Sequence, residues 1–347
     1  MTHRNARRGA GLPTWTAVLS ALLLTGLSAG LIQAAHAQVA APTLVVAAPL
    51  GPGLHTLEVA HGGMARKVLL YIPARSAAVA AGRAPGQAWP LVLALHGGGG
   101  HAAFMADDER YGLRSQADRS GFVVAFPNGY SKWPGGRFAT WNAGGCCGDA
   151  RDRQIDDVGF LRAVVADVQT RVPIDPARVF ATGMSNGGMM SHRLACEAAD
   201  VFRAVASVAG TDATTTCAPS RPVAVLQIHA RNDTHVLFNG GAGKEAFRDE
   251  SKVMDFVSVP ATISRWVQRQ QCQPVPRRTL ERPGPAGAHC EAYSGCKGQQ
   301  PVALCVTETG GHSWPGASVV RRGKEAASQA LDANAQIWAF FAASPVP

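Results

Sequence analysis

Residues 178–189 read RVFATGMSNGGM, and they hold the most informative pattern in the sequence. The apolar side chains of residues 179–181 predict the end of a buried strand, and the residues after the turn place apolar side chains at helical spacing. Between them, Ser185 is flanked by Gly183 and Gly187, which completes the pattern G-x-S-x-G. A sharp turn from strand to helix leaves no room for side chains two residues on either side, and it lifts the serine hydroxyl clear of the sheet. A glycine-rich chain also produces this pattern by chance, so an ordinary turn serine is the alternative.

The first 37 residues have the features of a secretory signal peptide. Three arginines within residues 1–8 precede an apolar run over 15–32, which ends in the small residues Ala35 and Ala37. A membrane anchor is the alternative, but glycine and serine interrupt the run and no second apolar span follows. We therefore expect residues 1–37 to be removed on export to the periplasm or the medium, with no membrane segment left after cleavage. Residues 38–347 are expected to form one catalytic domain.

The charge and its distribution limit the class of partner. The chain has 33 Lys and Arg against 24 Asp and Glu, for a net charge of +9. These cations are spread along the sequence and form no basic run interleaved with aromatic residues, so nucleic acid is not an expected partner. Nothing in the sequence fixes the oligomeric state.

All eight cysteines follow the predicted signal peptide, which indicates disulfides. Their spacing favours the pairs Cys196–Cys217 and Cys290–Cys305, and it leaves Cys272 for Cys296. The adjacent Cys146 and Cys147 form either a vicinal disulfide or two free thiols. No spacing of Cys and His matches a zinc site, so no metal is expected.

Strand and helix patterns alternate along the exported part. Helices are expected near 111–119, from Asp156 or Asp157 onward, after Ser185, and over 325–341. Alternation of this kind predicts an α/β fold, with a mostly parallel sheet covered by helices on both faces. The predicted strands are 67–72, 90–95, 121–126, 179–181, 204–208, 223–228 and 302–306.

An acid and a histidine follow Ser185 at the ends of predicted strands. Asp233 comes just after the strand at 223–228, and His312 comes just after the strand at 302–306, in the loop 310–316, GGHSWPG. A serine hydroxyl needs a neighbouring imidazole to take its proton, and the imidazole needs an acid to orient it. The order serine, acid, histidine is that of the α/β-hydrolases, so we expect Ser185, Asp233 and His312 to form a catalytic triad.

Other acids and histidines are weaker candidates. Asp212 follows the previous strand and is the main alternative to Asp233. His229 lies at a strand end, His235 lies very close to Asp233 in the chain, and His192 falls on the helix after the serine.

Two further stretches are expected near the serine. The glycines after His96 follow a buried strand, and backbone amides at such a place stabilise a developing oxyanion, for which we expect the N–H groups of Gly98 and Asn186. A flexible turn is the alternative. Trp141 and Trp314 are expected to bind substrate, although packing alone also accounts for tryptophans of this kind.

Six stretches in this order resemble the secreted polyhydroxybutyrate depolymerase and feruloyl esterase-like family of α/β-hydrolases, over nearly all of the exported part. The resemblance implies an ester substrate, no cofactor, and nucleophile, acid and base positions at Ser185, Asp233 and His312. The stretches are ALHGGGG at 94–100, WNAGGCCG at 141–148, DDVGFL at 156–161, GMSNGGMM at 183–190, HARNDTHVLFNGG at 229–241 and GGHSWPG at 310–316.

The sequence departs from this family at residues 242–259, which are charged and match it poorly. Met184 stands where related esterases that cleave terephthalate half-esters or gallate carry a cysteine, which argues against that group.

The function expected from these observations is hydrolysis of carboxylic esters by a secreted serine enzyme through an acyl-enzyme. The expected substrates are hydroxycinnamoyl esters of the feruloyl type or short 3-hydroxyalkanoate polyesters and oligomers. A serine peptidase on the same fold and a secreted binding protein without catalysis are the alternatives.

Overall fold

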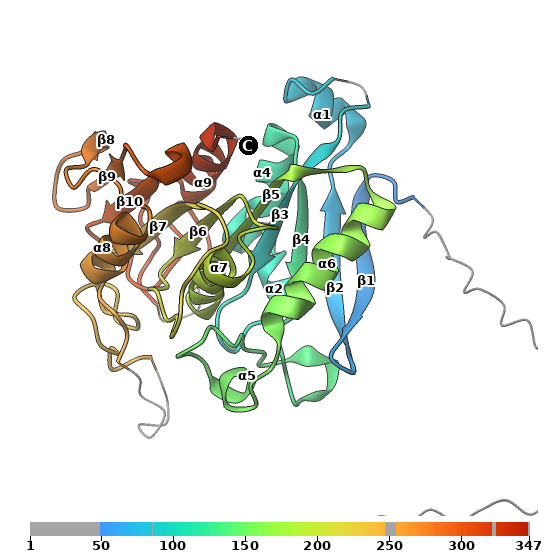
Figure 1. Cartoon of the computed structure of the whole chain (residues 1–347), viewed down its shortest axis with the longest axis horizontal. Helices are drawn as coiled ribbons and strands as arrows, with labels where there is room; N and C mark the ends of the chain where they lie inside the picture. Colours follow the sequence, from blue (N-terminus) through green and yellow to red (C-terminus); the bar gives the residue numbers. More distant parts are fainter. Residues whose placement is uncertain (1–48, 85, 247–254, 321–323, 346–347) are drawn as a thin grey trace, which may run out of the picture. The chain divides into compact units, whose positions relative to one another are not determined.

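The computed structural model describes residues 49–84, 86–246, 255–320 and 324–345, so the predicted signal peptide lies outside it. In these residues one sheet runs in the order β1-β2-β4-β3-β5-β6-β7-β10-β9-β8 (Figure 1). The strands are β1 Gly53–His61, β2 Met64–Ile72, β3 Trp89–Leu95, β4 Val123–Pro127, β5 Ile174–Met184, β6 Ala204–Val208, β7 Ala224–Ala230, β8 Arg277–Arg282, β9 Ala288–Tyr293 and β10 Val302–Thr307.

The middle of the sheet is parallel and its two sides are antiparallel. Strands β4, β3, β5, β6, β7 and β10 pair in parallel, whereas β1, β2 and β4 pair antiparallel on one side and β10, β9 and β8 on the other. The central strands are buried along almost their whole length, because helices cover both faces. This confirms the predicted α/β-hydrolase arrangement.

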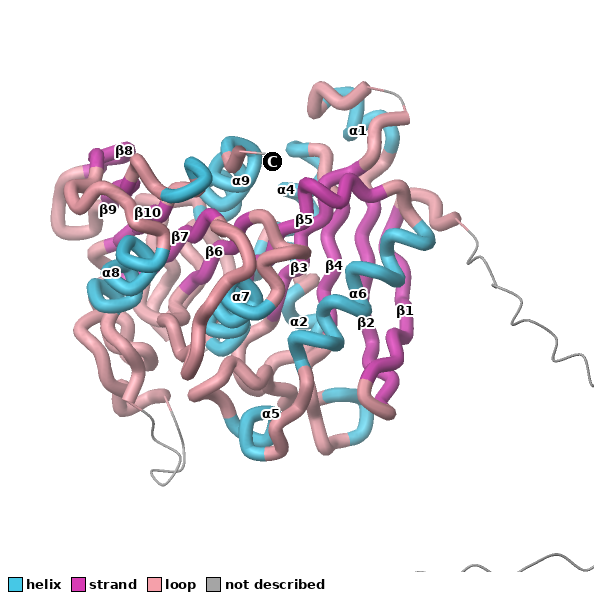
Figure 2. Tube along the Cα trace, in the orientation of Figure 1, coloured by secondary structure: helices cyan, strands magenta, loops and turns pink. Residues whose placement is uncertain are grey.

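Helices cover the sheet in two layers (Figures 1 and 2). Apolar residues of α6, α7 and α8 pack in one core cluster, and those of α2, α4 and α9 pack in the other. Among the described residues, no helix is long and apolar enough to span a membrane. The helices are α1 Arg75–Ala80, α2 Ala102–Met105, α3 Asp108–Tyr111, α4 Leu113–Ser120, α5 Gly148–Asp152, α6 Asp157–Arg171, α7 Asn186–Glu197, α8 Val259–Arg269 and α9 Ala333–Ala343.

The predicted cap of α6 is confirmed, but the last helix begins later than predicted. Asp156 accepts a hydrogen bond from Gly159 N–H at 2.8 Å at the start of α6. Residues 325–332 are not helical, because they hold the loop of His312: Glu325 accepts from Gly310 N–H at 3.1 Å, and Ser328 O accepts from Gly316 N–H at 2.8 Å. Asp332 then caps α9.

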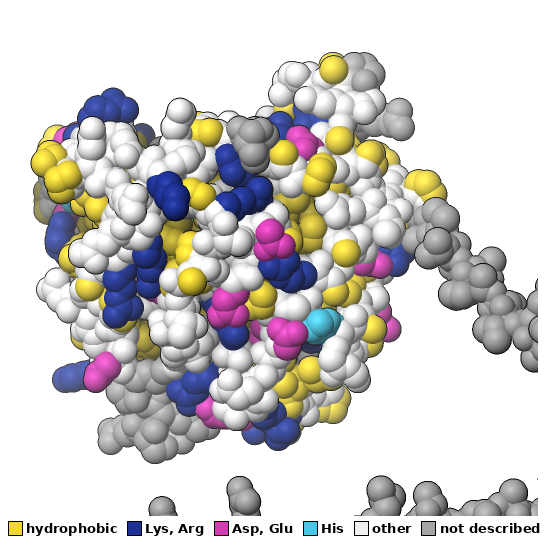
Figure 3. Space-filling view, viewed as in Figure 1, with side chains coloured by type: hydrophobic (Ala, Val, Ile, Leu, Met, Phe, Trp, Pro, Cys, Tyr) yellow, Lys and Arg dark blue, Asp and Glu magenta, His cyan; other side chains and the backbone are white. Residues whose placement is uncertain are grey.

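The structure pairs all eight cysteines, and it includes the three pairs that their spacing favoured. Cys290 and Cys305 lie directly opposite each other in β9 and β10, and Cys146 and Cys147 form the vicinal disulfide. The remaining bonds join Cys196 to Cys217 and Cys272 to Cys296. On the surface shown in Figure 3, Lys and Arg side chains are interspersed with Asp and Glu.

Candidate active site

Ser185 lies on a sharp turn between the end of β5 and the first residue of α7. Its φ of 55° and ψ of −120° lie in a region that residues with a side chain seldom adopt. Ser185 N–H donates to Val208 O at 2.8 Å, and Ser185 O accepts from Met189 N–H at 2.9 Å. These bonds hold the turn, and Ser185 stays partly exposed while its neighbours on both sides are buried. Backbone strain held by the surrounding structure is typical of functional sites.

The glycines on either side of Ser185 are required by close packing of backbone. A Cβ on Gly183 would lie 2.5 Å from Gly187 O and 2.8 Å from Leu95 O. A Cβ on Gly187 would lie 2.6 Å from His96 O. Any larger residue would therefore push β5, α7 and the loop after β3 apart. The turn is thus the close strand-to-helix turn that the pattern predicts.

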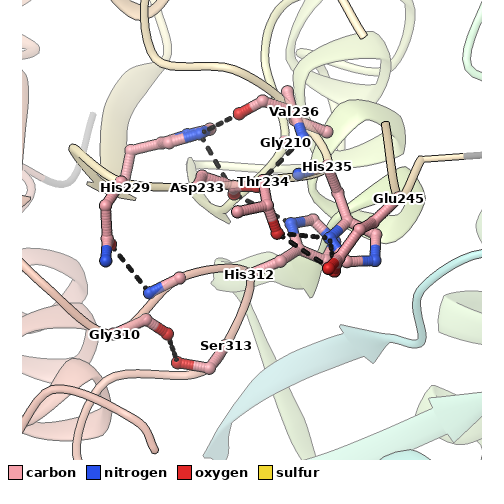
Figure 4. A network of polar contacts seen from close by, with 12 residues as sticks. Gly210, His229, Asp233, Thr234, His235, Val236, Glu245, Gly310, His312 and Ser313 are labelled. Atoms are coloured by element: carbon pink, nitrogen blue, oxygen red, sulfur yellow. Dashed lines mark hydrogen bonds and ion pairs between the residues drawn. The ribbon is translucent and has the colours of Figure 1, made fainter. Parts of the chain in front are cut away.

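Asp233 and His312 meet in loops that follow β7 and β10, which are neighbours in the sheet (Figure 4). His312 Nδ1 lies 2.8 Å from Asp233 Oδ2. The other oxygen of Asp233 accepts hydrogen bonds from His235 N–H at 2.7 Å and from Val236 N–H at 3.0 Å. These two backbone bonds fix the carboxylate, so Oδ2 is directed at the imidazole and His312 Nε2 is left for another partner.

The environment of Asp233 keeps its carboxylate ionised. Burial by itself raises the pKa of Asp233, but the nearby His312 and the contact with His229 outweigh burial, and the pKa lies well below its usual range. His229 Nε2 is 3.3 Å from Asp233 Oδ2, and both side chains are fully buried. An ionised carboxylate beside Nδ1 stabilises an imidazolium when His312 gains a proton.

The alternative acid, Asp212, lies in a different network. Its carboxylate forms an ion pair with Arg269 at 2.6 Å and accepts from the hydroxyl of Thr214 at 2.6 Å. Burial raises the pKa of Asp212, but the hydrogen bond from Thr214 and the charge of Arg269 lower it below its usual value. The geometry therefore pairs His312 with Asp233, as predicted.

His235 is a site residue that the sequence alone did not assign. Its ring stacks on that of His312, with centroids 4.4 Å apart and planes at 14° (Figure 4). Burial, together with the charges of His312 and Lys324, lowers the pKa of His235 to about 4. The side chain therefore stays neutral at pH 7. The sequence feature that could have identified His235 is its position two residues after Asp233, in the same loop.

One cavity of about 420 Å³ contains Ser185 and His312 on its walls. An aromatic wall is formed by Phe104, Tyr111 and Trp314, whose rings meet edge to face at 5.8 and 5.5 Å. The predicted Trp314 thus lines the cavity, whereas Phe104 and Tyr111 were not predicted. Charged and polar side chains form another part of the cavity wall: Arg110, Arg151, His235, Glu245 and Lys324.

Gly98 and Asn186, the predicted oxyanion residues, line the same cavity as Ser185. A Cβ on Gly98 would lie 3.7 Å from the Cβ of Asn186, so the two segments are adjacent. His96 anchors the glycine loop: its Nδ1 donates to Gly97 O at 2.8 Å, and its Nε2 accepts from Gly129 N–H at 2.9 Å. Full burial lowers the pKa of His96 to about 4.

Trp141 lies behind the cavity and is 0% exposed. Its indole N–H donates to His96 O at 2.9 Å, and its backbone exchanges hydrogen bonds of 2.7 and 2.9 Å with the side chain of Asn186. The expected substrate contact of Trp141 is therefore wrong, because protein atoms already cover the whole side chain. Instead, Trp141 joins the glycine loop to the start of α7.

A metal ion would fit poorly among Asp233, His235 and His312, although each offers a ligand atom within 4.8 Å of the others. Lone pairs of imidazole nitrogens lie in the ring plane, and the two stacked rings do not direct theirs at one point. The carboxylate is also already hydrogen-bonded by His312 and two backbone amides.

Comparison with known proteins identifies a family and relatives of the chain. A family model described as esterase PHB depolymerase matches residues 76–254, slightly more than half of the chain. The protein NocK of Nocardia uniformis subsp. tsuyamanensis is 30% identical over 270 residues, which cover 75% of this chain and 73% of NocK. Feruloyl esterase C of Emericella nidulans is 29% identical over 235 residues, which cover 66% of this chain and 72% of that enzyme.

Feruloyl esterase B of Piromyces equi is 33% identical over 198 residues, which cover 56% of this chain and 34% of that enzyme. The chain thus matches about a third of that esterase's length. Taken together, the α/β-hydrolase sheet, the matching family model and the extended alignments establish that the chain belongs to the PHB depolymerase family of esterases and is a carboxylic ester hydrolase.

Proposed function

We propose that the protein hydrolyses its esters by serine catalysis, with Ser185 as nucleophile, His312 as general base and acid, and Asp233 as the orienting carboxylate. The observation that carries this proposal is the 2.8 Å contact between His312 Nδ1 and Asp233 Oδ2, which orients a histidine that lines the same cavity as Ser185. The strained backbone of Ser185 supports the same assignment.

The reaction follows from these positions. Ser185 Oγ attacks the ester carbonyl carbon and passes its proton to His312 Nε2, since Nδ1 is already bonded to Asp233. The tetrahedral intermediate collapses, the C–O bond to the alcohol breaks, and His312 returns the proton to the leaving alkoxide. Water, activated by His312, then hydrolyses the acyl-serine to the free acid and restores Ser185.

The backbone amides of Gly98 and Asn186 are proposed to bind the oxyanion of the intermediate. Both residues line the cavity next to Ser185, and Asn186 is the first residue of α7, whose N-terminal N–H groups have no partner within the helix. Trp141 holds both segments from behind.

The acyl group is proposed to be aromatic, of the hydroxycinnamoyl type. The aromatic wall of Phe104, Tyr111 and Trp314 favours a planar ring, and relatives of the chain are named feruloyl esterases. Short 3-hydroxyalkanoate esters are the second candidate, because the matching family model carries the name PHB depolymerase.

The protein is also proposed to be exported by residues 1–37. The pairing of every cysteine in disulfides supports an oxidising compartment outside the cytosol.

A hydrolysis panel tests this proposal on the purified protein and its Ser185→Ala variant. The substrates are p-nitrophenyl esters from acetate to decanoate, methyl ferulate and a 3-hydroxybutyrate trimer. We expect the wild type to prefer methyl ferulate to the trimer and the variant to cleave none of them. Preference for the trimer would replace the aromatic assignment with the second candidate, and activity that survives in the variant would overturn the serine mechanism.

A further inference from the structure

A line of buried polar side chains runs from Asp233 into the protein, away from the cavity. His229, Gln227, His192 and Trp266 are each at most 1% exposed, and none lines the cavity. Trp266 Nε1 lies 3.0 Å from His192 Nδ1, His192 Nε2 lies 3.0 Å from Gln227 Oε1, and Gln227 Nε2 lies 3.1 Å from His229 Nδ1. Buried polar groups arranged in this way call for a physical reason, because burying them is costly.

The hydrogen bonds along this line of side chains all run in one direction, which is set by the indole of Trp266. An indole N–H only donates, so His192 Nδ1 must accept and the proton of neutral His192 lies on Nε2. That proton faces Gln227, which must present its carbonyl oxygen and therefore turns its amide N–H toward His229. His229 Nδ1 then accepts, and the proton of His229 lies on Nε2.

The proton at the end of this chain faces the loop of the catalytic acid. His229 Nε2 donates to Val236 O at 2.8 Å and lies 3.3 Å from Asp233 Oδ2. Val236 N–H in turn donates to Asp233 Oδ1. His229, near the end of β7, therefore fastens the turn of residues 233–236 and directs a positive hydrogen at the carboxylate (Figure 4).

We propose that His229 is a positioning residue for ester hydrolysis, and that Trp266, His192 and Gln227 act together to fix its tautomer; this inference rests on the proposed triad. The opposite tautomer would place the lone pair of Nε2 against Val236 O and Asp233 Oδ2. Both contacts would become repulsive, and the carboxylate would lose its alignment with His312. This line of hydrogen bonds thus stabilises the one arrangement in which Asp233 faces the catalytic imidazole.

Nitrogen NMR on the wild type labelled with ¹⁵N-histidine tests the direction of the chain without a mutation. The signals of His229 and His192 are identified by their loss in His229→Gln and His192→Gln. We expect both residues to carry a proton on Nε2 and to have an unprotonated Nδ1. A proton on Nδ1 of either residue overturns the proposal. This readout is independent of activity, so it stands even if the proposed serine mechanism fails.

Two polar substitutions of His229 test positioning. Glutamine places an amide N–H near the position of Nε2, whereas asparagine reaches only as far as Nδ1 and loses the donor toward Asp233. We expect His229→Asn to lower kcat on methyl ferulate by about tenfold or more with KM within about twofold, since a hydrogen bond to a charged group is lost. His229→Gln is expected to recover most of that loss. Equal kcat in the two variants, with both folded by circular dichroism, contradicts the proposal.

Gln227→Glu reverses the hydrogen bond between residue 227 and His229, because a carboxylate only accepts hydrogen bonds. His229 Nδ1 must then carry a proton to meet it, which the nitrogen spectrum reports directly, and kcat is expected to fall by about tenfold. Gln300→Glu is the matched control, since Gln300 is 1% exposed but takes no part in this line of hydrogen bonds. If Gln227→Glu leaves the His229 spectrum and kcat as in the wild type, the proposal is wrong. If this variant does not fold, the nitrogen spectrum of the wild type and the comparison of His229→Asn with His229→Gln still test the proposal.

Discussion

At the residue scale, both carboxylate oxygens of Asp233 are held by neighbouring groups. Its Oδ1 accepts two backbone N–H groups, so an asparagine at this position would direct its amide nitrogen, and not an oxygen, at His312. His312 would then hold the wrong tautomer for removing the proton of Ser185. We expect Asp233→Asn to lower kcat by about 10³ to 10⁴-fold while circular dichroism shows a folded protein. A loss smaller than tenfold would show that another group orients His312.

His96 makes stability depend on pH. Its folded-state pKa is about 4, below the usual 6.5, because the side chain is buried and its Nε2 is occupied by Gly129 N–H. A depressed pKa stabilises the fold above pH 6.5, and that contribution is lost as the pH falls toward the folded pKa. Between pH 7 and pH 4 the free energy of unfolding should fall by about 3 kcal/mol through this group.

His96→Gln is the comparison, because glutamine keeps an acceptor for Gly129 N–H and does not titrate. Denaturant unfolding at pH 7 and pH 4 should show a loss about 3 kcal/mol smaller in this variant than in the wild type. The same loss in both proteins would contradict a neutral, buried His96.

At the element scale, the disulfide between Cys290 and Cys305 joins β9 to the strand that carries the loop of His312. The bond closes a loop of 15 residues, for which chain entropy alone gives about 3 kcal/mol. The double variant Cys290→Ala/Cys305→Ala should therefore lose about 3 kcal/mol of unfolding free energy, measured with guanidinium chloride. An unchanged midpoint would show that this disulfide adds nothing to the free energy of unfolding.

The sequence predicted the elements whose pattern is strong and missed those whose pattern is weak. The central strands are continuous apolar runs, so they were found. Strand β1 has only two buried residues, Leu57 and Val59, and β8 is almost entirely exposed, so neither was assigned a strand. Residues 325–332 have the composition of a helix, but their backbone and Glu325 bind the loop of His312 instead. Tertiary contacts of this kind leave no local signal.

Site prediction followed the same division. Ser185, Asp233 and His312 each follow a recognisable strand, so chain order was enough to predict that they lie together; the structure places Asp233 against His312, which lines the same cavity as Ser185. Trp141 was misplaced because its indole is bonded to a carbonyl 45 residues away in the chain, which no local pattern reports. His235 was set aside for its nearness to Asp233, although the turn between them brings its ring onto His312.

At the scale of the whole molecule, the cavity is assembled from segments that lie far apart in the sequence. Phe104 and Tyr111 come from the region after β3, and Trp314 comes from the loop after β10. Their rings form one wall, and we expect only the larger acyl group to reach it. Phe104→Ala should therefore lower kcat/KM for methyl ferulate by about tenfold and for p-nitrophenyl acetate by less than about threefold. Equal losses on both esters would show that the aromatic wall does not determine which ester the enzyme prefers.

Covalent labelling by a fluorophosphonate, read by intact-protein mass spectrometry, tests whether Ser185 is the nucleophile of this esterase. The wild type should gain one probe mass, peptide mapping should place it on Ser185, and hydrolysis should stop as labelling proceeds. Ser185→Ala should gain none. A label on any other residue, or an unlabelled wild type that hydrolyses esters, would contradict the catalytic site described above.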